Sequence, residues 1–437
     1  MNLKIVALAF FTGTVALSAQ KVEFEEYDLD NGLHVILHKD NAAPVVTTSV
    51  MYHVGGKDRE EGRTGFAHFF EHLLFEGTEN IENGKWFEIV SSNGGTNNAN
   101  TSQDRTYYYE VFPSNNLELG LWMESERMLH PVIEKDGVDT QNEVVKEERR
   151  SSYDNRPYGQ MIFAISENLF DKHPYKDPNV GYMKDLDAAT LDEFKDYFKK
   201  YYVPNNAVLV VAGDIDINKT KELINAYFAA IPRGEKLTRS YPKEDPITQE
   251  RDAKAYDANI QLPASITAYR TPGYGERDSY VLNMISTYLS GGKSSVLYKD
   301  LVDTKKLAAQ VGAFNQEQED YGMYLIFALP LGETSLETLS SEIESKIEKL
   351  RTDLISQEDF EKLQNNAEAD FVNSNSSIAG IAGSLATYYM LYDNTDLINT
   401  EIDIYRSITK EEIREVANKY LKPTQRVVLE YLPKEQQ

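Results

Sequence analysis

The alternation of apolar and polar residues near the amino terminus predicts β-structure. Residues 23–28 alternate, residues 30–32 carry the turn signal Asp-Asn-Gly, and residues 33–37 return as a second strand. Residues 45–52 form a run rich in β-branched side chains, which favours a further strand. We therefore expect the chain to enter its first domain through a β-hairpin followed by a third strand.

Helical spacing and strand patterns then follow each other. Apolar residues recur at helical intervals over residues 66–75, 115–129 and 139–152, and glycines precede and follow the first of these segments. Residues 94–110 carry a Gly-Gly turn and then a strand rich in Thr and Tyr, and residues 207–212 form an apolar strand. The mixture of strands and helices predicts an α+β fold.

The second half of the chain is a faint copy of the first. The strand that ends at Tyr269 resembles the one that ends at Tyr52, an offset of 217. The Tyr-Leu-Lys-Pro stretch that ends at Pro423 resembles the one that ends at Pro204, an offset of 219. Nearly constant offsets indicate duplication. We predict two homologous α/β domains, each a mostly antiparallel sheet packed with helices.

Composition shifts set the expected boundaries. Residues 1–20 carry Lys4, a short apolar run and small residues before Gln20, which is typical of a cleaved signal peptide; a short membrane anchor is the alternative. A polar, proline-containing stretch at residues 234–258 is expected to link an amino-terminal domain, 21–233, to a carboxy-terminal domain, 259–437. A cleaved signal implies a periplasmic or secreted protein.

Charge and cysteine content narrow the chemistry. The formal net charge is -25, which argues against nucleic acid and anionic membranes as partners, and no later segment is apolar enough for stable membrane insertion. The chain has no cysteine, so disulfides and thiolate metal ligands are excluded. Any metal ion must be held by His, Asp or Glu.

The segment His68-Phe-Phe-Glu-His72 carries the most specific chemistry. Two histidines four apart project from one face of a helix, and Glu71 flanks them. This is the H-x-x-E-H pattern of one class of zinc proteases, although a helix with two surface histidines is the alternative. Catalytic zinc keeps three protein ligands and one water, whose proton a nearby carboxylate can take. Carboxylates that could complete the site cluster in residues 143–150.

Several motifs together resemble the pitrilysin-type (M16) zinc peptidases, half-length processing-peptidase-like bacterial members above all. They are Gly65-Phe-Ala-His-Phe-Phe-Glu-His-Leu-Leu-Phe-Glu-Gly-Thr78, Asn31-Gly-Leu-His-Val35, Asn93-Gly-Gly-Thr-Asn-Asn-Ala-Asn-Thr101, Tyr202-Val-Pro-Asn-Asn206 and Val211-Ala-Gly-Asp214. The resemblance spans nearly the whole chain after residue 20. It implies one half of a clam-shell peptidase, completed by a related subunit in a heterodimer or by a second copy in a homodimer.

The resemblance also assigns roles to residues. His68 and His72 are the expected ligands of one Zn²⁺ ion and Glu71 the general base. The third ligand of the family, a glutamate about 76 residues after the second histidine, falls on Glu148, with Glu147 as the neighbouring alternative. The peptide substrate is expected to extend an edge strand at Asn98, Ala99 and Asn100.

Two departures bear on activity. A second catalytic glutamate of the family is replaced by Gln141, and an Arg and Tyr that grip the scissile peptide are replaced by Val302 and Ala309. The second half also lacks metal ligands at residues 277–282, so only the first half is expected to hold zinc. We therefore expect an exported zinc endopeptidase whose partner supplies the missing pair. A non-catalytic or structural subunit is the alternative, and a metal-storage role suits a single catalytic-type site poorly.

Overall fold

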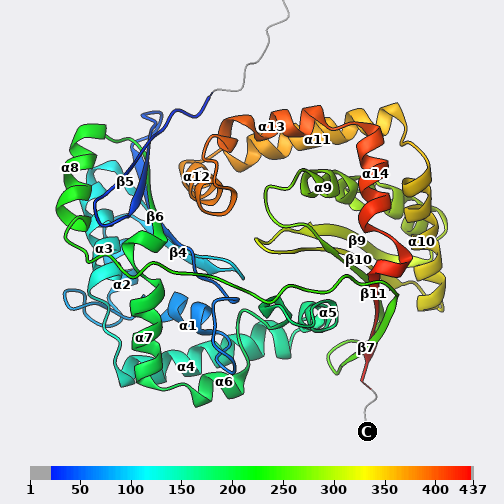
Figure 1. The fold of residues 1–437 in the computed structure, drawn as a ribbon, viewed down its shortest axis with the longest axis horizontal. Coiled ribbons are helices and arrows are strands. Elements are labelled where there is room, and N and C mark those ends of the chain that lie inside the picture. The colour runs from blue at the N-terminus through cyan, green and yellow to red at the C-terminus, as the bar shows by residue number, and fades with distance from the viewer. Residues whose placement is uncertain (1–20, 435–437) are drawn as a thin grey trace, which may run out of the picture.

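The structure, a computed structural model, describes residues 21–434, so the expected signal peptide lies outside the described residues. A six-stranded sheet in the order β1-β2-β6-β3-β5-β4 forms the first half, and a five-stranded sheet in the order β7-β11-β8-β10-β9 forms the second (Figure 1). The strands are β1 Glu25–Asp28, β2 His34–Lys39, β3 Val45–Tyr52, β4 Thr96–Thr101, β5 Thr106–Pro113, β6 Ala207–Gly213, β7 Arg251–Asp257, β8 Ala264–Thr271, β9 Ala308–Gln316, β10 Gly322–Pro330 and β11 Arg426–Pro433.

Helices cover both sheets. Those of the first half are α1 Phe66–Leu73, α2 Trp86–Ser92, α3 Leu117–Leu129, α4 Lys135–Arg149, α5 Met161–Leu169, α6 Met183–Ala188, α7 Leu191–Tyr201 and α8 Ile217–Phe228. Those of the second half are α9 Arg277–Ser290, α10 Leu336–Thr352, α11 Gln357–Ser374, α12 Ile378–Tyr392, α13 Leu397–Ser407 and α14 Lys410–Tyr420. This architecture confirms the predicted α+β fold.

The two halves repeat each other in detail. In each sheet one pair of strands is parallel, β2 with β6 and β7 with β11, and the remaining neighbours are antiparallel. Helices α7 and α14 both begin with a capping box, at Thr190 and at Thr409. These two threonines are 219 residues apart, the same offset that separates Pro204 from Pro423. The predicted duplication is therefore present down to single capping residues.

Each half lends one helix to the other. Helix α5 packs on the second sheet, where Ile165 and Leu169 join a core with Ile266 and Leu429. Helix α12 packs on the first sheet, where Leu385 and its neighbours contact residues of β3 and β6. Figure 1 shows α12 above and α5 below the space between the two sheets. The exchange buries apolar surface across the junction, so neither half completes its core alone.

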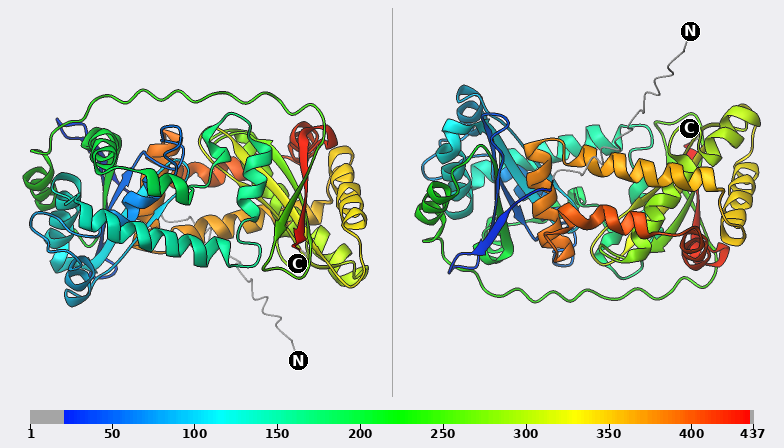
Figure 2. Two further views of the ribbon diagram at one scale, coloured as in Figure 1. Left: turned by 90° about the horizontal axis from the view of Figure 1, so that it is seen from below. Right: turned by 90° about the horizontal axis from the view of Figure 1, so that it is seen from above.

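The expected linker is shorter than residues 234–258. Its last part, residues 251–257, forms β7, which pairs in parallel with β11 at the edge of the second sheet. Side chains alternate along β7 between half-buried and exposed, a pattern that many charges in this segment obscure in the sequence. The remaining residues, 234–250, contain no helix or strand, and Figure 2 shows this extended segment crossing from one half to the other.

Within residues 21–434, the search for a helix both long and apolar enough to cross a membrane finds none.

Candidate metal centre

Helix α1 is held in place by aromatic side chains on its buried face. Phe66, Phe69 and Phe70 all contact Phe194 on α7, with ring centroids 4.7, 4.5 and 6.0 Å apart. Gly65 precedes the helix with a φ of 85°, and a Cβ there would lie 2.8 Å from the backbone of Gly181. The helix is thus fixed on one face, and its other face is free to carry His68, Glu71 and His72.

The carboxyl end of α1 rests on a buried charged cluster. Arg127 donates to the carbonyl of Leu74 at 3.0 Å, and the Tyr108 hydroxyl donates to the carbonyl of Phe70 at 2.9 Å. Arg127 also pairs with Glu110 at 3.0 Å and with Glu124 at 3.1 Å, and all three of these side chains are fully buried. These bonds satisfy helix carbonyls that would otherwise have no partner. The sequence analysis did not find this support, because charged residues are rarely expected in a core.

Three predicted ligands converge on one point. Glu148 Oε2 lies 3.0 Å from His72 Nε2 and 3.6 Å from His68 Nε2. The three candidate ligand atoms all lie within 4.8 Å of one another. His68 and His72 come from α1 and Glu148 from the last turn of α4, just before a π-helical turn at Arg150–Asp154. π-Helical turns are frequent at functional sites.

The donor set and its spacing fit zinc. In tetrahedral zinc sites, bonds of about 2.0–2.2 Å to nitrogen and oxygen place ligand atoms roughly 3.3 Å apart. The two printed separations, 3.0 and 3.6 Å, fall on either side of that value. Two imidazoles and one carboxylate also form a donor set that catalytic zinc uses. The described residues can therefore hold one zinc ion without rearrangement of the backbone.

Glu148 and Glu147 point in different directions. Hydrogen bonds from His68 and then His72 hold the pKa of the Glu148 carboxyl well below its usual range. The Glu147 side chain is 69% exposed and pairs with Arg150 at 3.1 Å. The structure thus brings Glu148 to the histidines and leaves Glu147 on the outer face of α4.

Glu71 and Tyr153 complete the surroundings. Glu71 is half-buried on α1, and within the described residues it makes no side-chain hydrogen bond or ion pair. Burial raises the pKa of Tyr153, and the charges of Glu148 and Glu71 raise it further, so Tyr153 lies beside both carboxylates. Nothing in the sequence singled out Tyr153. Its position follows from the π-helical turn, which no local pattern predicts.

The predicted substrate strand, β4, is an edge strand of the first sheet. The Ser102 N–H donates to the Arg105 carbonyl at 2.9 Å, which fixes the alternation of hydrogen bonds along the β4–β5 hairpin. By that alternation Asn98 and Asn100 pair with β5 through their backbones, and Ala99 turns its N–H and C=O toward the open edge. The Ala99 N–H now bonds the Asn98 side chain at 3.0 Å.

The residues that depart from the family pattern have structural roles. Gln141 on α4 donates to Glu76, just beyond the end of α1. Val302 packs against the core of the second half, and Ala309 is exposed on β9. Neither Val302 nor Ala309 carries a side chain that could bind a peptide carbonyl, so the described part of this chain lacks the expected pair at these positions.

Comparison with known proteins agrees with this arrangement. The family model described as "Insulinase (Peptidase family M16)" matches residues 34–180, and "Peptidase M16 inactive domain" matches residues 188–367. A curated relative, "Zinc protease PqqE" of Helicobacter pylori, is 31% identical over 97% of this chain and 96% of its own length.

Two solved structures show the same fold. A protease from Helicobacter pylori superposes with a TM-score of 0.88 at 30% identity, covering 94% of this chain and 99% of the other. The periplasmic protease PqqL from Escherichia coli superposes with a TM-score of 0.78 at 19% identity, covering 95% of this chain and 48% of PqqL. At that lower identity the likeness concerns the fold alone.

A duplicated α+β half with a candidate metal centre in its first domain is the architecture of a half-length peptidase. The chain belongs to peptidase family M16, and its relative in Helicobacter pylori is named a zinc protease.

Proposed function

We propose that the chain is an exported zinc-dependent endopeptidase that cleaves peptides or unfolded segments inside an enclosed chamber. The observation that carries this proposal is the convergence of His68, His72 and Glu148, with Glu71 next to them on α1. An export signal at residues 1–20 supports a periplasmic or secreted location, as does the periplasmic relative PqqL.

Each residue has a distinct role in the proposed reaction. His68, His72 and Glu148 hold the ion, and zinc when bound supplies a Lewis acid that lowers the pKa of a water molecule. Glu71 takes the proton of the attacking water and returns it to the amine that leaves. Glu71 suits this role because, within the described residues, no cation or hydrogen-bond donor pairs with its carboxylate.

The open edge of β4 is the proposed substrate site. A peptide in extended form adds to this edge as a further strand, with Ala99 supplying the backbone N–H and C=O. The Asn98 side chain must first release the Ala99 N–H, to which it now bonds. Asn98 and Asn100 then border the peptide through their side chains. Recognition of this kind reads the peptide backbone more than the side chains.

A second subunit is part of the proposal. The chain matches 48% of PqqL, so two chains of this length correspond to one PqqL. Val302 and Ala309 stand where relatives carry the Arg and Tyr that grip the peptide. We infer that a related subunit in a heterodimer supplies this pair, and a homodimer is the second arrangement to test.

The purified chain, with and without a co-expressed related subunit, decides between these possibilities. The experiment measures zinc content by mass spectrometry and cleavage of an unfolded protein. We expect one zinc ion per chain and full cleavage only with the partner. Full cleavage by the chain alone, as monomer or homodimer, would contradict the partner proposal. Zinc without cleavage in every combination would favour the alternative, a non-catalytic subunit, which Gln141, Val302 and Ala309 keep open.

A further inference from the structure

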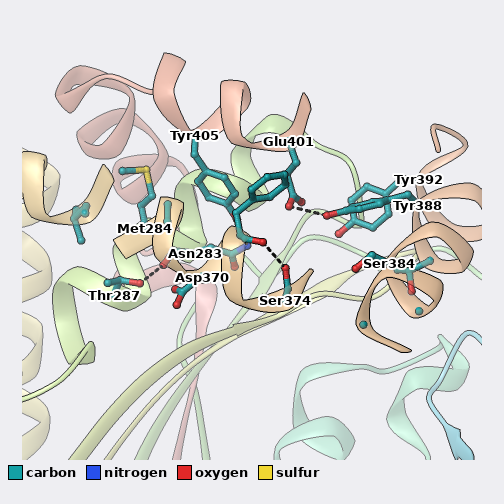
Figure 3. Close-up of a pocket in the computed structure, with 16 residues that line it drawn as sticks. Asn283, Met284, Thr287, Asp370, Ser374, Ser384, Tyr388, Tyr392, Glu401 and Tyr405 are labelled. Atoms are coloured by element: carbon teal, nitrogen blue, oxygen red, sulfur yellow. Dashed lines mark hydrogen bonds between the residues drawn. The ribbon is translucent and has the colours of Figure 1, made fainter. Parts of the chain in front are cut away.

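The second half contains a cavity where the first half has its candidate metal centre. Helix α9 follows β8 as α1 follows β3, and α11 occupies the place of α4 in the order of elements. Asn283 and Thr287 lie four residues apart on α9, as His68 and His72 do on α1, and Asp370 lies on α11 (Figure 3). The cavity between α9, α11, α12 and α13 has a volume of about 530 Å³.

The lining of this cavity is acidic and aromatic. Glu401 and Asp370 contribute carboxylates, and among the described residues that line the cavity none is Lys, Arg or His. Tyr388, Tyr392 and Tyr405 contribute rings, and the Tyr388 hydroxyl donates to Glu401 at 2.8 Å (Figure 3). An aromatic face attracts a cation through its quadrupole, and a carboxylate attracts the same cation directly. The lining is thus complementary to a positive charge.

Glu401 lacks the ionic partner that its position calls for. Burial raises the pKa of its carboxyl, and the charge of Glu317 adds to this effect. Glu317 itself bonds Ser279 at 2.5 Å and Asn283 at 3.3 Å, immediately beside the cavity. Within residues 21–434, Glu401 forms no ion pair, and its hydrogen bond comes from a neutral hydroxyl. A half-buried carboxylate is stabilised when a cation pairs with it.

The cavity adjoins the proposed substrate strand. Its wall at Gly383 on α12 faces Tyr107, because a Cβ at Gly383 would lie 3.6 Å from the Tyr107 hydroxyl. Tyr107 is the cross-strand neighbour of Asn100 on β4. On another side, Tyr392 contacts Tyr274 with ring centroids 5.1 Å apart. A peptide on the edge of β4 therefore lies on the same side of the junction as the cavity.

We infer that this cavity is a specificity pocket for a cationic group of the bound peptide, an Arg or Lys side chain. The inference rests on the proposed peptidase function and adds a side-chain preference to a strand that otherwise reads backbone. An arginine uses both features of the lining, because its planar guanidinium stacks on tyrosine rings and pairs with a carboxylate. The net charge of -25 favours the approach of such peptides as well.

Direct binding to the zinc-loaded full chain that carries Glu71→Gln tests this pocket without cleavage. A labelled extended peptide of neutral residues receives one Arg at successive positions, and fluorescence anisotropy gives each Kd. We expect one position at which Arg binds about tenfold more tightly than Gln, a difference of about 1.4 kcal/mol. The same position with Lys, or with a free amino terminus, shows which source of positive charge the pocket prefers.

Two matched variants locate the effect. Glu401→Gln keeps an acceptor for Tyr388 and removes the charge, so the Arg-to-Gln ratio should fall to near one. Asp403→Asn removes an exposed carboxylate from the same helix, which pairs with Arg406 at 3.3 Å, and should leave the ratio unchanged. Circular dichroism melting confirms that both variants fold.

An unchanged ratio in Glu401→Gln, or the absence of any position that prefers Arg, overturns the specificity pocket. Either result leaves the peptidase proposal standing if the wild-type chain with its partner cleaves peptides. Conversely, charge-dependent binding without any cleavage retains the pocket as a peptide-binding site and removes the proposed catalytic function.

Discussion

The metal centre of the first half and the cavity of the second half occupy equivalent places in a duplicated fold, yet their chemistry differs. The first presents His68, His72 and Glu148, and the second presents Asn283, Thr287 and Asp370. Both sets combine two residues four apart on one helix with a carboxylate from another. Duplication therefore supplies a hollow between helices in each half, and the side chains decide what each hollow can bind.

The support beneath the two sites differs in the same sense. Under α1, Glu110 and Glu124 pair with Arg127 in the core. The register of the sheets makes Ile326 the counterpart of Glu110, because Thr48 faces Glu110 and Thr267 faces Ile326. Ile343 and Lys346, each 219 residues after Glu124 and Arg127, complete the set. An apolar core supports α9, whereas a buried ion cluster holds the helix that carries the metal ligands.

The largest expected effect comes from removing the carboxylate of the metal centre. Glu148→Ala leaves two imidazoles, too few for a stable zinc site, so zinc content should fall from one ion per chain to near zero and cleavage should cease. Glu147→Ala on the outer face of α4 is the matched control and should keep both zinc and cleavage. Metal analysis after gel filtration measures the outcome. The reverse pattern would move the ligand by one residue.

Removing the proposed base sharpens the comparison further. Glu71→Gln keeps the shape of the side chain and all three ligands, so zinc content should stay near one per chain. The rate of cleavage should fall by about 10²–10⁴-fold, the usual contribution of a general base. Initial rates with the partner present, together with zinc analysis of the same sample, give both values. Unimpaired cleavage would show that another group accepts the proton.

The buried cluster predicts an asymmetry in stability between the halves. Arg127→Met leaves Glu110 and Glu124 in the core without a cation, which should cost about 3–5 kcal/mol of the free energy of unfolding. Lys346→Met, at the equivalent position, breaks a partly exposed pair with Asp300 at 2.9 Å and should cost at most about 1 kcal/mol. Urea denaturation followed by fluorescence measures both changes. Equal losses would mean that the cluster gives α1 no special support.

The sequence was sufficient for the fold class, for the duplication and for the residues that meet at the metal centre. The strand and helix periods, the constant offset and the His68–His72 spacing are local signals, and each survives in the structure. The buried Arg127 cluster, the position of Tyr153 and the exchange of α5 and α12 arise from packing between distant segments. The strand β7 was missed because its edge position allows Arg251, Asp252 and Lys254 where a buried strand would not.

The smallest effect tests how closely the halves correspond in energy as well as in geometry. Thr190 and Thr409 accept hydrogen bonds from Glu193 and Glu412 in equivalent capping boxes, with N–O distances of 3.3 and 3.2 Å. Thr190→Ala and Thr409→Ala should each lower the free energy of unfolding by about 1 kcal/mol. If urea melts separate into two transitions, each variant should shift its own half. A larger loss at Thr190 is inconsistent with equal capping, and it would show that α7 is coupled to the aromatic contacts that hold α1.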